Sequence, residues 1–218
     1  MDYKEFLRQS MKENEEAVKK LVQEQRQKQI RALSSRSGIP KRFKKCTINN
    51  YDARYNPRTK EMAIKFIKEF PNTRGLLLSG PVGTGKTHIA AAIANEMINK
   101  LYSVYFGNIV DIMTFIKSTY SNKSDITEEV AINLMTKEVD LLIIDDLGKE
   151  NSTDHTLSML YQLINRVYEN EKTIIVTTNE SSTELKRKLR DKGPAIVSRI
   201  TEMCEPVILK GKDWRLKK

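Results

Sequence analysis

The feature that most constrains this chain is an eight-residue motif, residues 80–87, that fits the pattern G-x-x-x-x-G-K-[ST] at every fixed position. It lies between a short apolar run, residues 75–79, and an Ala- and Ile-rich run, residues 86–100, with helical patterning. Glycines let such a loop curl until several backbone N–H groups point at one phosphate, and the N-terminus of the next helix adds its dipole. The motif therefore predicts a strand, a phosphate-binding loop and a helix, in that order.

The motif also assigns roles to single residues. Lys86 can supply a cation to the β- and γ-phosphates of a nucleoside triphosphate, and the Thr87 hydroxyl can bind Mg²⁺. We therefore expect ATP and Mg²⁺ as cofactors, with His88, the next residue, also in contact with the nucleotide. The expected nucleotide contacts are Gly80, Pro81, Val82, Gly83, Thr84, Gly85, Lys86, Thr87 and His88.

A pair of carboxylates follows a second apolar run. Residues 141–144 are all apolar, which suits a strand buried on both faces, and Asp145 and Asp146 come directly after them. Ligands of open α/β sheets bind at the C-terminal ends of the strands. We expect Asp145 to hold Mg²⁺ through water and Asp146 to orient and deprotonate the attacking water. Two aspartates alone more often form a turn, but the upstream loop favours the functional interpretation.

A β-branched run, residues 174–178, ends at Asn179. At a strand end an amide can hold the attacking water near the γ-phosphate, and Thr178 can assist it. Asparagine after a strand is also a common turn former, so both interpretations stay open at this point.

The rest of the chain alternates between helix and strand patterns. We predict helices at residues 60–70, 86–100, 109–120, 156–168 and 182–189, and strands at residues 75–79, 103–106, 140–145, 173–178 and 206–210. This alternation predicts an α/β fold, a parallel sheet with helices on both faces. We expect three segments: an N-terminal helical segment at residues 1–36, a linker at residues 37–58 and an ATPase domain at residues 59–218.

The N-terminal segment has its own character. Residues 2–33 contain no Gly or Pro and are rich in strong helix formers. Their apolar stripe is broken, which favours one or two exposed helices that dock on a partner, or a solvated helix without one. The chain carries a net charge of +10, and most of this excess lies in residues 1–45. Such a balance favours nucleic acid as a partner, although a basic soluble protein can have the same composition.

Several classes of protein are disfavoured. No apolar run approaches the ~18 residues of a membrane span, and the first residues lack the apolar stretch of a secretory signal. Cys46 and Cys204 are far apart and not in metal-ligand spacing, so we interpret them as reduced thiols of a cytoplasmic protein.

Together, these elements resemble the AAA+ superfamily of P-loop ATPases, and within it the bacterial and phage helicase loaders of the DnaC/DnaI type and the related IstB transposition ATPases. The resemblance covers roughly residues 38–215. It rests on the motif at 80–87, on residues 145–148 and 177–179, and on the entry through residues 37–40 that leads to Asn50 and Tyr51. It implies an AAA+ core without a full lid domain, since the chain stops soon after Arg215. It also implies a weak ATPase, stimulated by DNA or a partner, in which Asp146 replaces the Glu of many AAA+ proteins.

The resemblance implies further residues and partners. Arg199, in residues 193–200, matches the arginine finger that reaches the γ-phosphate of a neighbouring subunit, and Arg215 matches the sensor arginine of the same subunit. The N-terminal helices would bind the hexameric replicative helicase, and the core would bind single-stranded DNA, with self-association on the helicase. Lys117 and Tyr120 would contact DNA, although core packing is equally open for Tyr120. No zinc-ligand cluster lies in the N-terminal segment, which favours DnaC over DnaI.

Three alternatives remain at this stage. An IstB-like transposition ATPase would bind duplex DNA and a transposase. A small-molecule kinase shares the phosphate loop, but the N-terminal segment and Asn179 argue against it. A nucleotide-binding scaffold without turnover would tolerate loss of Lys86.

Overall fold

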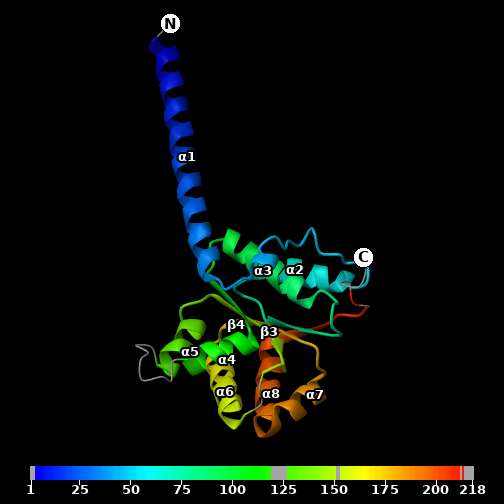
Figure 1. Cartoon of the computed structure of the whole chain (residues 1–218). Coiled ribbons are helices and arrows are strands. Elements are labelled where there is room, and N and C mark those ends of the chain that lie inside the picture. Colours follow the sequence, from blue (N-terminus) through cyan, green and yellow to red (C-terminus); the bar gives the residue numbers. More distant parts are fainter. Residues whose placement is uncertain (1–2, 119–126, 151–152, 212, 214–218) are drawn as a thin grey trace.

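The computed structural model describes residues 3–118, 127–150, 153–211 and 213, with side chains from residue 18 onward. Its centre is a five-stranded sheet of order β2-β3-β4-β1-β5, in which every neighbouring pair is parallel. The strands are β1 (Gly75–Ser79), β2 (Val104–Asn108), β3 (Leu141–Leu147), β4 (Thr173–Thr178) and β5 (Cys204–Ile208). The predicted α/β fold with a parallel sheet is confirmed (Figure 1).

Helices cover both faces of this sheet. On one face lie α2 (Pro57–Glu69) and α3 (Lys86–Asn99), and on the other lie α4 (Ile109–Ser118), α6 (Asp154–Glu169) and α8 (Gly193–Met203) (Figure 1). A hydrophobic core lies on each face of the sheet, and alternate residues of β3 pack into one or the other. Leu141 and Ile143 face α3, while Leu142 and Ile144 face α6. This alternation is why the strand reads as an unbroken apolar run. The remaining helices are α5 (Glu128–Thr136) and α7 (Ser182–Lys188).

The N-terminal segment is a single helix, α1 (Tyr3–Arg36), that projects away from the core (Figure 1). Its last turns dock on the α3 side of the core through Ile30 and Leu33, and Arg26 donates a hydrogen bond to the Asn99 carbonyl. Farther out, Val18, Leu21 and Val22 are about 60% exposed. Apolar packing thus anchors the base of the helix and leaves its outer part without a partner among the described residues.

The structure departs from the predicted elements in three places. Two helices, α4 and α5, separate β2 from β3 where one was predicted, and α8 was not predicted at all. β5 spans Cys204–Ile208 rather than residues 206–210, and so Pro206 lies inside the strand instead of at its start. Proline is tolerated there because β5 is an edge strand, where a missing N–H need not break a ladder. Among the described residues, no helix is both long and apolar enough to cross a membrane.

Candidate nucleotide-binding site

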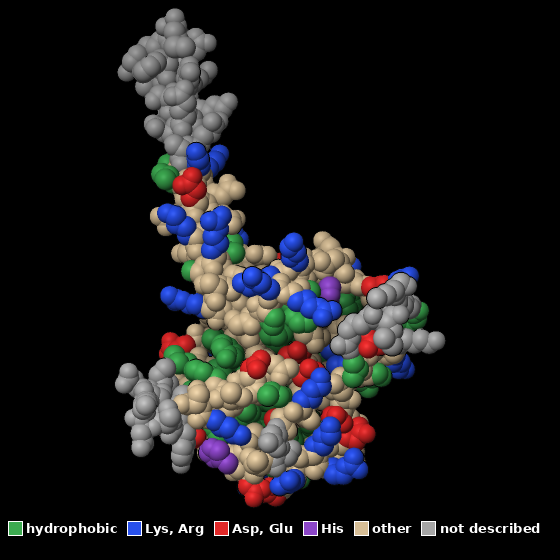
Figure 2. All heavy atoms as spheres, in the orientation of Figure 1, with side chains coloured by type: hydrophobic (Ala, Val, Ile, Leu, Met, Phe, Trp, Pro, Cys, Tyr) green, Lys and Arg blue, Asp and Glu red, His purple; other side chains and the backbone are tan. Residues whose placement is uncertain are grey.

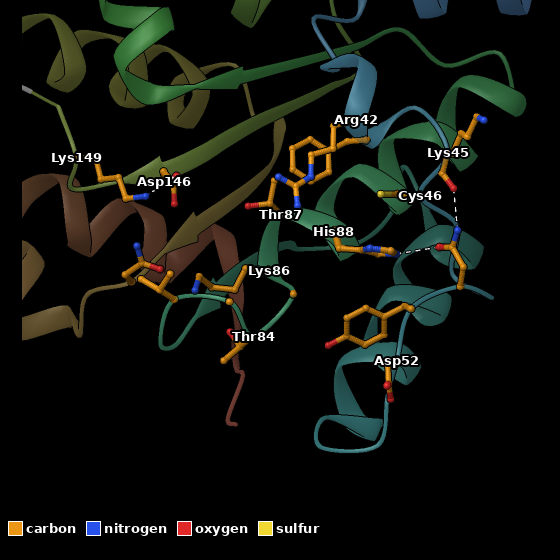
Figure 3. Close-up of a pocket in the computed structure, with 17 residues that line it drawn as sticks. Arg42, Lys45, Cys46, Asp52, Thr84, Lys86, Thr87, His88, Asp146 and Lys149 are labelled. Atoms are coloured by element: carbon orange, nitrogen blue, oxygen red, sulfur yellow. Dashed lines mark hydrogen bonds and ion pairs between the residues drawn. The ribbon is translucent and has the colours of Figure 1, made fainter. Parts of the chain in front are cut away.

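A pocket of about 520 Å³ lies at the C-terminal edge of the sheet, where β1, β3 and β4 end (Figure 3). One wall is the phosphate loop with the start of α3, and a second comes from residues 42–52. The third is formed by Asp146, Lys149 and Asn179. Four segments that are distant in sequence thus meet at the edge where open α/β sheets bind ligands.

The phosphate loop has the backbone that its glycines predict. Gly80, Gly83 and Gly85 all have positive φ, and Gly85 caps α3 in the left-handed conformation. A Cβ on Gly80 would lie 2.1 Å from the Leu209 carbonyl oxygen, so a larger residue would displace the strand beside it. Lys86 is 5% exposed, and its ammonium donates to the Gly80 and Pro81 carbonyls, at 2.7 Å each. The loop is therefore built around its lysine.

Thr87 and Asp145, the two expected Mg²⁺ residues, are in direct contact. The Thr87 hydroxyl donates to Asp145 Oδ1 at 2.9 Å, which joins the first turn of α3 to the end of β3. Asp145 is 6% exposed, and its burial raises the pKa of its carboxyl group, while hydrogen bonds from Thr177 and Thr87 oppose this shift. A carboxylate and a hydroxyl are hard oxygen donors of the kind that Mg²⁺ prefers, and so these residues fit the ion.

Thr177 is a site residue that the sequence analysis missed. Its fully buried hydroxyl donates to Asp145 Oδ1 at 2.7 Å and accepts from the Asp146 backbone N–H at 2.9 Å. One side chain on β4 thus orients both aspartates at the end of β3. The available signal was a hydroxyl residue two positions before Asn179, on the strand that pairs with β3.

Replacing Thr177 with valine should weaken Mg²⁺-dependent nucleotide binding by roughly 10-fold, the worth of a buried hydrogen bond to a charged group. Without that hydroxyl the pKa of Asp145 should rise further. A carboxylate binds the cation only when it is ionised. As the solution is acidified, the variant should therefore lose nucleotide binding at a higher pH than the unmodified protein. Titration of a fluorescent ATP analogue between pH 5 and 8 measures both effects. Thr136→Val is the matched control, because Thr136 is equally buried on α5 and its hydroxyl donates to the Ile132 carbonyl of the same helix; equal losses in both variants would contradict the role of Thr177.

Asp146 faces the pocket from an unusual backbone conformation. Its φ is +60°, and the pairing of β3 with β4 shifts register between Ile144 and Leu147. This irregularity turns Asp145 inward and Asp146 toward the pocket. Asp146 Oδ2 lies 2.7 Å from the Lys149 ammonium and 3.4 Å from the Asn108 amide. Neither partner was identified from the sequence.

Asn179 and His88 also line the pocket, whereas Thr178 does not. The Thr178 hydroxyl donates to the Leu147 carbonyl, so it fastens β4 to β3 instead of assisting at the pocket. His88 Nε2 lies 2.9 Å from Asn50 Oδ1, and its ring is 5.8 Å from that of Tyr51. Burial lowers the pKa of His88, which keeps its ring neutral near pH 7. The linker therefore contributes to the pocket wall, which its composition did not indicate.

Arg199 lies on α8 and does not line this pocket. Its guanidinium carbon is 5.1 Å from the centre of the Tyr161 ring and 5.7 Å from that of Tyr168, and Nη2 donates to the Tyr161 hydroxyl. Two aromatic rings thus contact the arginine, which does not line the pocket at the phosphate loop. Arg215 and Tyr120 fall outside the described residues, and Lys117 lies in the last turn of α4.

Comparisons with known proteins agree with this geometry. Residues 3–218 match the family described as IstB-like ATP binding protein. The replicative helicase loader DnaC of Escherichia coli (strain K12) is 30% identical over 177 residues, which cover 79% of this chain and 71% of the relative. The DnaC of Buchnera aphidicola subsp. Acyrthosiphon pisum is 30% identical over 149 residues, covering 67% and 60%.

Solved structures agree as well. The crystal structure of the DnaC helicase loader superposes with a TM-score of 0.68 at 26% identity, covering 78% of this chain and 100% of that one. AMPPCP-bound DnaA from Aquifex aeolicus shares the fold, with a TM-score of 0.66 at 24% identity over 76% of this chain and 50% of that one. The phosphate loop, the acidic strand end and these matches together show that the chain belongs to the family of IstB-like ATP-binding proteins, as a DnaC-type member of the AAA+ superfamily.

Proposed function

We propose that this protein hydrolyses ATP with Mg²⁺ and uses the cycle to load a replicative helicase onto DNA. The observation that carries the ATPase proposal is the contact between Thr87 and Asp145, because it brings the phosphate loop and the acidic strand end into one site. Mg²⁺, when bound, would neutralise phosphate charge. The loop amides and Lys86 would hold the phosphates, and Thr87 and Asp145 would hold the ion.

Hydrolysis also needs groups that act on the water. Asp146 and Asn179 face the same pocket, and so Asp146 can accept the proton of a water that Asn179 holds. Arg199 would act on the nucleotide of a neighbouring subunit, since it lies away from its own pocket. Arg215 is proposed, from its position in the sequence, to contact nucleotide in its own subunit. A shorter acid than Glu at position 146 supports a slow ATPase that depends on partners or DNA.

The loader proposal rests on the relatives and on α1. Relatives from Escherichia coli and Buchnera aphidicola are named replicative helicase loaders, and Val18, Leu21 and Val22 are exposed on the described part of α1 that projects from the core. Figure 2 shows Lys and Arg side chains along the described part of this helix and on the adjoining core. We propose that the helical segment at residues 1–36 binds the hexameric helicase. The ATPase core at residues 59–218 would bind single-stranded DNA, with Lys117 as one contact to a phosphate.

The test is ATPase activity of the full chain with single-stranded DNA and with the replicative helicase of the same organism, alone and together. We expect each to raise the rate and the helicase to be retained by the protein. Leu21→Glu should abolish the helicase effect and spare the DNA effect, because Leu21 belongs to the exposed apolar group on α1. Gln23→Glu is the matched control on the same exposed stretch.

A second candidate is an IstB-like ATPase that binds duplex DNA and a transposase; its support is the match to the family described as IstB-like ATP binding protein. Stimulation by duplex DNA and retention of a transposase, with no response to the helicase, would support this alternative and overturn the loader proposal.

A further inference from the structure

A lysine outside the predicted site lies against the proposed general base. Lys149 lines the nucleotide pocket, and its ammonium is 2.7 Å from Asp146 Oδ2 (Figure 3). The turn between them fixes this contact, because the Lys149 backbone N–H donates to the Asp146 carbonyl and Gly148 takes a positive φ. The chain therefore folds back so that the lysine side chain lies over the carboxylate.

The pair is held loosely. The side chains of Lys149 and Asp146 are 48% and 21% exposed, and water screens an ion pair that is this open. Arg42, Lys45 and Lys86 also line the pocket, and Lys86 donates to two loop carbonyls. Lys149 can therefore leave the Asp146 carboxylate at little cost in free energy and bind a stronger anion in the pocket.

We propose that Lys149 is a positioning residue that distinguishes nucleoside triphosphates from diphosphates. Without a γ-phosphate it pairs with Asp146; with one, it moves to that phosphate, which carries more charge and more acceptor oxygens than a carboxylate. Asp146 is then free to take a proton from water, as the water oxygen bonds to the terminal phosphorus and the bond to the ADP oxygen breaks. This inference rests on the proposed role of Asp146 in hydrolysis.

The first test compares binding of ADP with binding of a non-hydrolysable ATP analogue, both with Mg²⁺. Lys149→Met should weaken binding of the analogue roughly three- to tenfold, the range for a partly exposed charge-assisted contact, and change ADP binding by less than about twofold. Lys149→Arg keeps the charge and should keep the discrimination. Lys192→Met is the matched control, because Lys192 also pairs with an aspartate, Asp191, but lies outside the pocket. Equal weakening of both nucleotides by Lys149→Met would overturn the proposal.

A second test uses a double-mutant cycle. Asp146→Asn removes the competing carboxylate, so the analogue should bind roughly threefold more tightly while Lys149 is present. In the Lys149→Met background the same change should give no gain. A gain that persists without Lys149 would reflect only lost repulsion between carboxylate and phosphate, and it would overturn the inference.

The same preparations separate this inference from the proposed function. If Asp146→Asn hydrolyses ATP as fast as the unmodified protein, the role of Asp146 in hydrolysis is wrong. If turnover is lost but the binding cycle shows no coupling, the hydrolytic role stands and only the inference about Lys149 fails.

Discussion

Replacing Lys86 with alanine should reduce ATP hydrolysis by roughly 100-fold or more, the usual loss when one preorganised charge on the reacting phosphate is removed. The reason is visible in the loop. Lys86 is almost fully buried, and its ammonium lies within the curve of the loop, bonded to the Gly80 and Pro81 carbonyls. When a nucleotide binds, its phosphates would replace the two carbonyls as partners of this ammonium group. Alanine has no charged group that could bind them. Turnover under saturating Mg·ATP, with helicase and DNA present, is the measurement.

The matched control is Lys100, which lies at the other end of the same helix. Lys100 also donates to a backbone carbonyl, that of Ile67, at 2.7 Å, yet it follows the last turn of α3. Lys100→Ala should therefore retain activity, and thermal melting of both variants separates lost chemistry from lost folding. A Lys86→Ala protein that is folded and still fully active in helicase loading would identify the chain as a nucleotide-independent scaffold.

The place of the phosphate loop between a strand and a helix could be predicted because its pattern is local. The glycines, Lys86 and Thr87 are adjacent in sequence, and the strand and helix beside them carry strong patterns; β1 has the predicted bounds. Asp145 and Asp146 could be singled out for a similar reason. A buried parallel strand appears in the sequence as an apolar run, and its C-terminal end lies at the edge of the sheet where ligands bind. Where a motif lies directly beside a strand or helix with a clear pattern, the sequence predicts individual residues of the candidate site.

The side chains that contact those residues could not be predicted from the sequence, because these contacts depend on which strands become neighbours. Thr177 matters only because β4 pairs with β3, and no local pattern encodes that pairing. Asn50 and Tyr51 belong to a linker of ordinary composition, and only the folded chain brings them to His88. Lys149 lies three residues beyond Asp146, yet its direction depends on the turn at Gly148 and on the backbone of Asp146.

The missed helices have a different cause. α8 begins with Gly193 and Pro194, which normally indicate a loop, although proline is well accommodated in a first helical turn. α5 is nine residues long, so its apolar residues span too few turns to give a clear helical period. In both cases tertiary burial against α6 stabilises a helix whose own signals are weak.

Replacing Arg199 with alanine should reduce the partner-stimulated ATPase by roughly 1,000-fold, the scale of a missing arginine at a transferring phosphoryl group. Nucleotide binding by the isolated subunit should stay unchanged, because Arg199 does not line its own pocket. The two tyrosines beside it support this assignment, since Tyr161 and Tyr168 hold the guanidinium fixed. Arg199→Met fills the same space without charge, so it controls for lost packing and should be equally inactive.

Mixing two inactive proteins provides the sharpest test of this shared site. A Lys86→Ala subunit has a defective loop but retains Arg199, whereas an Arg199→Ala subunit has an intact loop and lacks the arginine. If the arginine acts between subunits, mixed assemblies on the helicase contain interfaces that unite the intact halves, and part of the activity returns. If it acts within its own subunit, no mixture can unite them, and the rate stays at that of the single variants. Arg199 would then have to reach its own nucleotide from α8, although its guanidinium lies against Tyr161 and Tyr168 and does not line the pocket at the phosphate loop.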